Sequence, residues 1–376
     1  MRVLSVFGTR PEAIKMAPVI HQLAGRPGVE HRICVTAQHR SMLDQVLELF
    51  AIRADYDLDL MVEGQTLNAV AAGVLGGLQE VGEEFHPDLV LVQGDTTSAL
   101  AAALAAFHLG VAVGHVEAGL RTGDLAAPWP EEANRRLISV LARWHFAPTP
   151  AARQNLLAEG VAEGRVLLTG NTVIDALLHA RDRLAHEPVL RARVEAGLPA
   201  LDPGRRLILV TNHRRENFGP AMARVAAAIE RLAARPDVQV VFPVHLNPNV
   251  QAAFRQRLGG LANARLIAPV GYLEFVHLMD RAHLIITDSG GIQEEAPSLG
   301  RPVLVTRRRT ERPEALAVGA ARLVGDDDAT IVAQAERLLD DPVEYARMTG
   351  VANPYGDGRA ARRIVDHLVA ALDGEA

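Results

Sequence analysis

The sequence predicts an α/β protein built from two doubly wound domains, and three observations favour this fold. The chain has 376 residues, which is more than a single hydrophobic core usually serves. Short apolar segments of β type alternate with helix-like segments along the chain, as in parallel sheets with right-handed crossovers. These segments form two series of about six, so two open sheets are favoured over the alternative, one closed barrel.

The expected strands of the first series are 2–7, 31–36, 88–93, 111–116, 145–147 and 165–169. Those of the second series are 206–211, 238–244, 266–268, 283–287, 302–306 and 322–324. Between the two series, the prolines of residues 182–204 lie in charged, alanine-rich sequence, as expected of a domain connection. Ligands of open parallel sheets collect at the carboxyl ends of the strands, so we expect a binding cleft between the domains.

Composition excludes several classes of protein. The single cysteine, Cys34, rules out an intramolecular disulfide framework and lies in an apolar run, where packing is its expected role. No apolar run is long enough to cross a bilayer, and residues 3–7 are too short for a signal peptide, so a cytoplasmic protein without membrane insertion is expected. A formal net charge of −6 argues against nucleic-acid binding.

The turn after the first expected strand carries Lys15, the only lysine among 39 lysine and arginine residues. Gly8 permits a sharp turn there, and Thr9 and Glu12 have the spacing of a capping box at a helix start. A helix start beside a compact ammonium group favours an anion. The alternative is codon bias that left one lysine by chance.

Polar clusters also follow four other strands, at 94–98, 117–121, 212–217 and 288–295. In the last cluster, Gly290 and Gly291 would let backbone amides approach a phosphate, and Glu295 could accept hydrogen bonds from a ribose; a simple tight turn is the alternative. The glycine patterns of dinucleotide-binding and P-loop folds are missing, and the histidines lack metal-ligand spacing, so we expect no cofactor and no metal.

Three carboxylates, Asp95, Glu117 and Glu131, lie near expected strand ends or in the loop that follows, and His213 comes from the second series. Neighbouring buried carboxylates acquire different pKa values, so such a group could both remove and donate protons. Each residue also has a structural alternative. The acids could cap or begin helices, and His213 could be a core histidine.

Taken together, the motifs resemble the bacterial non-hydrolysing UDP-N-acetylglucosamine 2-epimerases over essentially the whole chain. The matching segments, in order, are FGTRPEAIKMAP, QGDTTS, GHVEAGLRTGD, PWPEEANRRL, LTGNTVIDAL, HRRENFG, PVHLNPNV, TDSGGIQEEAPSLG, TERPEA and NPYGDGRA. The resemblance implies a GT-B fold with two Rossmann-like domains around an interdomain cleft. We expect these domains at 1–170, joined by a C-terminal helix at about 357–376, and at 171–356.

The resemblance further implies interconversion of UDP-GlcNAc and UDP-ManNAc by elimination and re-addition of UDP, without a cofactor, in a protein that is usually a homodimer. The implied catalytic residues are Asp95, Glu117, Glu131 and His213. The implied UDP-binding residues are Arg10, Lys15, Ser289, Gly290, Gly291, Glu295 and Arg312.

The chain departs from the family at three places. Arg308 and Arg309 add charge to the loop before Arg312. The second, substrate-activating site of some members is matched at Gln38, Glu131, Arg214 and His245, whereas Ser41 and Gly64 replace a glutamine and an arginine. The alternatives are an epimerase for a related UDP-2-acetamido sugar, a hydrolysing epimerase, a GT-B glycosyltransferase and a catalytically silent UDP-sugar sensor.

Overall fold

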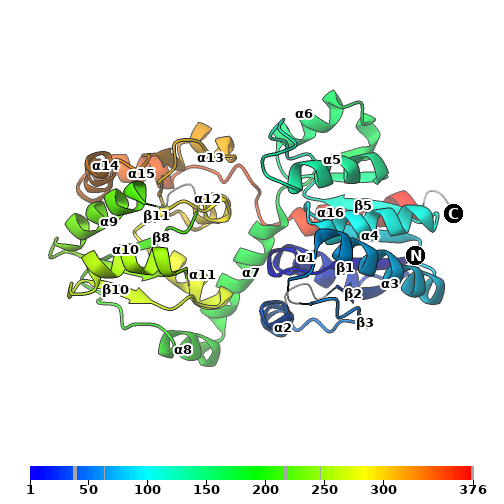
Figure 1. Ribbon diagram of the computed structural model, residues 1–376, viewed down its shortest axis with the longest axis horizontal. Helices are drawn as coiled ribbons and strands as arrows, with labels where there is room; N and C mark the ends of the chain where they lie inside the picture. The colour runs from blue at the N-terminus through cyan, green and yellow to red at the C-terminus, as the bar shows by residue number, and fades with distance from the viewer. Residues whose placement is uncertain (37–39, 63, 215–218, 246, 374–376) are drawn as a thin grey trace. The chain divides into compact units, whose positions relative to one another are not determined.

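The computed structural model describes residues 1–36, 40–62, 64–214, 219–245 and 247–373. The chain divides into two compact units (Figure 1). Unit 1 comprises Met1–Ala176 and Tyr355–Ala376, and unit 2 comprises Leu177–Pro354. Each unit contains its own parallel sheet and its own buried apolar cluster.

Unit 1 contains, among the described residues, a seven-stranded sheet in the order β3-β2-β1-β4-β5-β6-β7, with every pairing parallel. The order reverses between β1 and β4, as in doubly wound sheets. The strands are β1 (Arg2–Phe7), β2 (Glu30–Val35), β3 (Tyr56–Asp57), β4 (Leu89–Gln93), β5 (Ala112–Val116), β6 (Trp144–Ala147) and β7 (Val166–Leu168).

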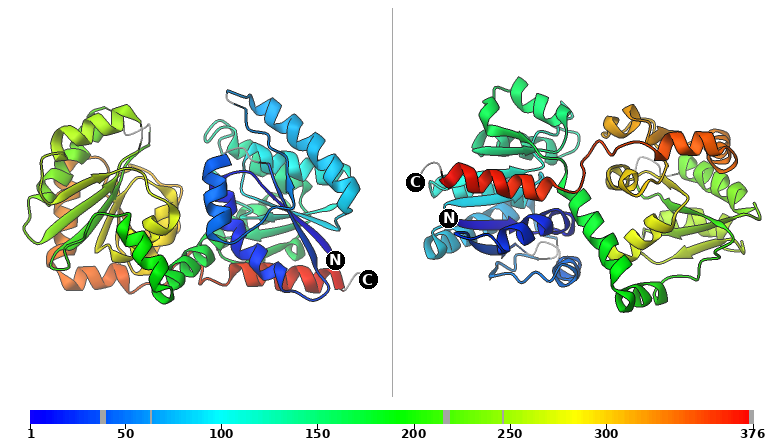
Figure 2. Two further views of the ribbon diagram at one scale, coloured as in Figure 1. Left: turned by 90° about the horizontal axis from the view of Figure 1, so that it is seen from below. Right: turned by 180° about the vertical axis from the view of Figure 1, so that it is seen from behind.

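Helices connect these strands and cover the sheet of unit 1 (Figure 2). They are α1 (Arg10–Ala24), α2 (Arg40–Leu49), α3 (Leu67–Phe85), α4 (Thr97–His108), α5 (Glu131–Leu141), α6 (Pro150–Ala158), the start of α7 (Thr172–His186) and α16 (Ala360–Asp373), with the short 3-10 helix η1 (Glu163–Arg165). The C-terminal helix α16 packs against α1, where Arg26 pairs with Asp366 (Figure 2).

Unit 2 contains a six-stranded parallel sheet within the described ranges, in the order β10-β9-β8-β11-β12-β13. Its strands are β8 (Arg206–Thr211), β9 (Val238–Pro243), β10 (Ala264–Ile267), β11 (Leu284–Thr287), β12 (Val303–Val305) and β13 (Ala321–Leu323). Its helices are α8 (Pro188–Ala196), α9 (Pro220–Ala233), α10 (Pro248–Leu258), α11 (Tyr272–Arg281), α12 (Gly290–Glu295), α13 (Pro313–Ala317), α14 (Asp328–Asp340) and α15 (Pro342–Thr349), with the 3-10 helix η3 (Ala296–Leu299).

The two open sheets confirm the predicted fold, and the closed-barrel alternative is wrong. All twelve expected strands are present, and the sequence prediction missed only β3 among the strands of the described residues. β1 shows why the strands form: five of its six residues are buried, as in a parallel strand covered on both faces. Across the described residues, none of the helices combines the length and the apolar character that a bilayer crossing needs.

Candidate active site

In unit 1, the Glu117 carboxylate lies just after β5 and is almost fully buried. Lys15 on α1 places its Nζ 2.6 Å from Oε1 and 2.7 Å from Oε2 of Glu117. The Glu117 backbone has a φ of 66°, a left-handed conformation that costs a residue with a side chain about 1 to 2 kcal/mol. Strain of this kind is concentrated at functional sites, where the surrounding contacts hold it in place.

Asp95 follows β4 at the same edge of the sheet, and three side chains fix it. The Arg135 guanidinium lies 2.7 Å from Oδ2 of Asp95, and the Asn134 amide donates to the Asp95 carbonyl at 2.9 Å. Burial lowers the pKa of His115 to about 3, so its ring is neutral, and Nε2 donates to the Gly94 carbonyl at 2.7 Å. The turn that carries Asp95 is therefore fixed by contacts to its side chain and to two of its backbone carbonyls.

Burial raises the pKa of Asp95, and the positive charge of Arg135 opposes this effect. The negative charges of Glu117 and Glu131 raise the pKa further. A perturbed carboxylate pKa beside a specific charge partner is characteristic of groups that transfer protons. Asp95 therefore has the environment of a general acid or base.

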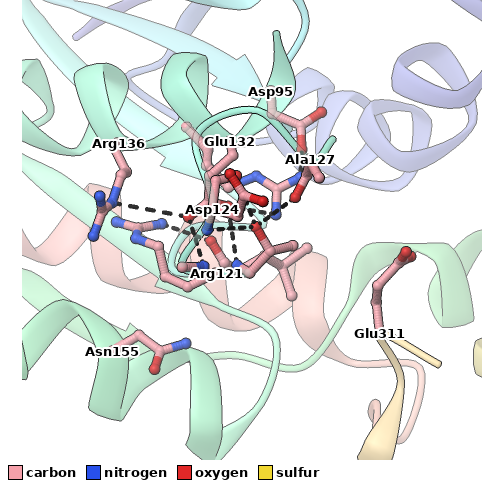
Figure 3. A network of polar contacts seen from close by, with 12 residues as sticks. Asp95, Arg121, Asp124, Ala127, Glu132, Arg136, Asn155 and Glu311 are labelled. Atoms are coloured by element: carbon pink, nitrogen blue, oxygen red, sulfur yellow. Dashed lines mark hydrogen bonds and ion pairs between the residues drawn. The ribbon is translucent and has the colours of Figure 1, made fainter. Parts of the chain in front are cut away.

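Glu131 is the first residue of α5, and its neighbour Glu132 has a different role. The Glu132 carboxylate is completely buried and accepts the backbone amides of Thr122 at 3.0 Å and Gly123 at 3.3 Å (Figure 3). Arg121 in the same loop pairs with Glu159 at 2.6 Å. Glu132 thus shapes the loop before α5, while Glu131 is half-buried and contributes charge near Asp95.

The first turn of unit 1 confirms the predicted capping box. Glu12 accepts the backbone amides of Thr9 at 2.8 Å and Gly8 at 3.0 Å, and Thr96 donates to its other oxygen at 2.6 Å. A Cβ atom on Gly8 would lie 1.9 Å from the Thr36 hydroxyl, so only glycine fits there. The Glu12 carboxylate of the protein itself therefore accepts the hydrogen bonds of the Gly8 and Thr9 amides.

Of the two cations expected to bind UDP from unit 1, Arg10 is the half-buried first residue of α1. Lys15 lies one helical turn further along and is the partner of Glu117 described above. The anion that meets Lys15 in this structure is thus a carboxylate of the protein.

In unit 2, His213 follows β8 and rests on the buried carboxylate of Asp288. Oδ2 of Asp288 accepts the backbone amides of His213 at 2.9 Å and Arg214 at 2.8 Å, and Oδ1 lies 3.4 Å from His213 Nδ1. The His245 ring stacks on the His213 ring at 5.7 Å. Burial lowers the pKa of His213, and Asp288 opposes that shift.

The Ser289, Gly290 and Gly291 backbone lies at the start of α12, as the paired glycines predicted. A Cβ atom on Gly290 would lie 3.7 Å from a guanidinium nitrogen of Arg214 and 3.9 Å from one of Arg312. Two arginines therefore flank this backbone in unit 2, a suitable environment for a phosphate group.

The carboxylates of α12 separate into two roles. Glu294 is buried and pairs with Arg312, which it holds beside Gly290. Glu295 is 8% exposed, and its Oε1 accepts the Tyr272 hydroxyl at 3.2 Å. Glu295 is thus fixed as a hydrogen-bond acceptor in the same unit as the arginines.

The residues expected at a second site are only partly placed. Gln38 lies outside the described residues, and of Ser41 only the backbone, in α2, is described. Gly64 has a φ of 73° in an open turn, whereas Arg214 and His245 both adjoin His213. Arg308 extends outward and lies 3.3 Å from Asp326.

No individual role was predicted for the residues that support the site, chiefly Asp288, Glu294, Arg135, Gln93 and Asn171. Asp288 and Gln93 stand at strand ends, a position that was a usable signal. No group of acidic, histidine or cysteine side chains suited to a metal ion occurs within the described part of the chain.

Comparisons with known proteins identify the family of this chain. The profile of the UDP-N-acetylglucosamine 2-epimerase family matches residues 21–369. The chain is 56% identical over 369 residues to UDP-N-acetylglucosamine 2-epimerase from Escherichia coli O157:H7, covering 98% of each protein. It is 50% identical over 370 residues to that of Neisseria meningitidis serogroup A, covering 98% of this chain and 99% of the relative.

Solved structures resemble the whole chain as well. The crystal structure of UDP-GlcNAc 2-epimerase from Neisseria meningitidis bound to UDP-GlcNAc matches with a TM-score of 0.90 at 50% identity, over 98% of this chain and 100% of that one. The Methanocaldococcus jannaschii enzyme in complex with UDP-GlcNAc and UDP matches with a TM-score of 0.80 at 34% identity, over 98% and 100%. By its sequence and by its GT-B fold, the chain belongs to the UDP-N-acetylglucosamine 2-epimerase family.

Proposed function

We propose that this chain interconverts UDP-GlcNAc and UDP-ManNAc by eliminating and re-adding UDP. The observation that carries the proposal is Asp95, a carboxylate of raised pKa held beside Arg135 and under the charge of Glu117 and Glu131. Inversion at C2 needs groups that remove a proton from one face of the sugar and return it to the other. A site that held UDP-sugar without chemistry would not need these acids.

The roles proposed for the groups are those that the family resemblance implies. In the forward direction a carboxylate takes the C2 proton while the anomeric C–O bond breaks, which leaves 2-acetamidoglucal and UDP. UDP then adds back while a second group protonates C2 from the opposite face. We assign the two proton transfers to Asp95 and Glu131, with Glu117 as the neighbouring charged group. His213 stabilises or protonates the departing diphosphate, and no redox cofactor or metal takes part.

UDP binding is assigned to the residues named from the sequence. The Ser289, Gly290 and Gly291 amides and the Arg312 guanidinium bind the diphosphate. Glu295, which Tyr272 orients, accepts the ribose hydroxyls. Arg10 and Lys15 are the residues of unit 1 that the family resemblance assigns to UDP binding.

The family resemblance also bears on regulation, assembly and location. A second UDP-sugar site would use Gln38, Arg214 and His245, and the losses at Ser41 and Gly64 weaken it. We propose a homodimer, as the family resemblance implies. The single cysteine and the anionic nucleotide-sugar substrate are consistent with a cytoplasmic enzyme.

The proposal is tested by incubating the purified protein with UDP-GlcNAc alone and separating the products by ion-exchange chromatography. Epimerisation yields UDP-ManNAc without net release of UDP, and Asp95→Asn should reduce turnover about a hundredfold or more. Stoichiometric free ManNAc and UDP would identify a hydrolysing enzyme. No conversion without an acceptor sugar would point to a glycosyltransferase, or to a sensor if UDP-GlcNAc still binds.

A further inference from the structure

The Glu117 carboxylate receives hydrogen bonds from two buried amide side chains in addition to Lys15. The Gln93 side chain, at the end of β4, donates Nε2 to Oε2 of Glu117. The Asn171 side chain, just before α7, donates Nδ2 to Oε1 at 3.0 Å. Both amides are at least 97% buried, Gln93 at 3% and Asn171 at 2% exposure. Three segments far apart in the sequence thus supply donors to one carboxylate.

The orientation of Asn171 is fixed by its other atoms. Its Oδ1 accepts the backbone amide of Val173 at 3.0 Å, so Nδ2 must face Glu117. A carboxylate ion can only accept hydrogen bonds, and donors on both oxygens favour its ionised form. Glu117 is therefore held as an anion in one orientation, whereas burial raises the pKa of Asp95.

Asn171 also lies where two parts of the chain meet within unit 1. Its backbone amide donates to the Tyr355 carbonyl at 2.6 Å. A Cβ atom on Gly170 would lie 3.2 Å from the Cα of Gly356, so the two segments touch through their backbones. Residues from Tyr355 onward are those that return from unit 2 to unit 1. Asn171 thus bonds with its side chain to Glu117 and with its backbone to the returning segment.

We propose that Gln93 and Asn171 are positioning residues that hold Glu117 as an ionised acceptor beside Lys15, and that Asn171 ties this carboxylate to the returning segment at Tyr355. The inference deepens the proposed function and rests on it, because it concerns the catalytic site of the epimerase. It predicts that a change in either amide acts on turnover through Glu117.

The test replaces each amide by the acid of the same shape, in Asn171→Asp and Gln93→Glu. Each change puts a carboxylate oxygen against Glu117, and two carboxylates so close share one proton over part of the pH range. We expect kcat near pH 8 to fall by about tenfold or more, and to recover as the pH is lowered and the pair takes up its proton. KM should change by less than about threefold, as expected when ground-state binding is retained.

Asn263→Asp is the matched control, because Asn263 lies in unit 2 and its Oδ1 accepts from Arg205 rather than facing a carboxylate. Its pH–rate profile should follow that of the wild-type protein. The two test variants come from β4 and from the start of α7, so failure of one to fold leaves the other informative.

Melting temperatures provide a readout that does not need catalysis. The shared proton raises the folded-state pKa of the pair above its unfolded value, so each test variant should lose stability relative to wild type as the pH rises from about 5 to about 8. A shift in both melting and rate profiles supports the proposal. Melting shifts without any change in the pH–rate profile would overturn it, as would unchanged behaviour in both. A wild-type protein that fails to epimerise UDP-GlcNAc would reject the proposed function instead, while the melting comparison still tests the contact with Glu117.

Discussion

The contact between His213 and Asp288 allows one substitution to be worked through in detail. In Asp288→Asn, the amide oxygen can still accept the two backbone amides that Oδ2 now accepts. The amide nitrogen would then face Nδ1 of His213, where Oδ1 lies at 3.4 Å in the wild-type protein. The substitution keeps the shape of the site but turns an acceptor of the imidazolium proton into a donor.

The size of the effect follows from the distance and the exposure. Two unit charges about 4 Å apart interact by about 4 kcal/mol at an effective dielectric constant of 20. The His213 side chain is 42% exposed, and solvent screening reduces such an interaction to about 1 kcal/mol or less. Loss of the Asp288 charge should therefore lower the pKa of His213, by an amount that changes the imidazolium population up to about fivefold. Burial already lowers the pKa of His213, and loss of the Asp288 charge would lower it further.

The assay follows the His213 ring by NMR over a pH titration and compares it with kcat over the same range. Above the pKa, the imidazolium population should fall by up to about fivefold, and so should kcat if the proton of His213 is transferred to UDP. Asp237→Asn is the control, because Asp237 pairs with Arg206 and Arg235 in the same unit. An unchanged His213 titration in Asp288→Asn would refute the reasoning.

The other perturbations concern the ribose carboxylate, the α16 contact and the second site. Glu295→Ala should weaken UDP binding about ten- to a hundredfold by calorimetry, and unchanged affinity would contradict its assignment. Asp175 accepts the Ala361 amide, and burial raises its pKa from 3.8 to about 6. Its contribution to the free energy of unfolding is therefore full below pH 3.8 and is lost as the pH rises to about 6. Denaturant unfolding of the wild-type protein and of Asp175→Asn should show this as a change of roughly 2 to 3 kcal/mol in their difference. A difference in unfolding free energy between Asp175→Asn and the wild-type protein that stays constant with pH would exclude a raised pKa at Asp175. With Ser41 and Gly64 in place, UDP-ManNAc alone should be converted with hyperbolic kinetics, and a lag abolished by trace UDP-GlcNAc would show a working second site.

Most of the fold could be predicted because the strands are near-continuous apolar runs. β1 and β8 begin and end at the predicted residues, and the ends of the other predicted strands differ from the observed ones by no more than two residues. β3 could not be found in this way, because Tyr56–Asp57 has two residues, one half-buried and one exposed, and no apolar pattern. Its place in the sheet comes from pairing with β2.

The candidate site divides in the same way between local and distant contacts. The Thr9 and Glu12 capping box could be predicted because three residues of spacing determine it. The Lys15 contact with Glu117 joins residues 102 positions apart, and no spacing rule reveals it. The isolation of Lys15 predicted a specialised ammonium that binds an anion, but the sequence could not show that a carboxylate of the protein would be its partner.

Loss of the C2 proton during turnover distinguishes elimination and re-addition from other routes to epimerisation, and exchange with solvent reports it. The protein is incubated with UDP-GlcNAc in deuterated water, and the recovered UDP-sugars are examined by NMR at C2. Elimination and re-addition predict deuterium at C2 of UDP-ManNAc, and of UDP-GlcNAc as equilibrium is approached, without added metal or nicotinamide. Epimerised product that retains its original C2 hydrogen would contradict the assignment of Asp95, Glu117 and Glu131 to proton transfer.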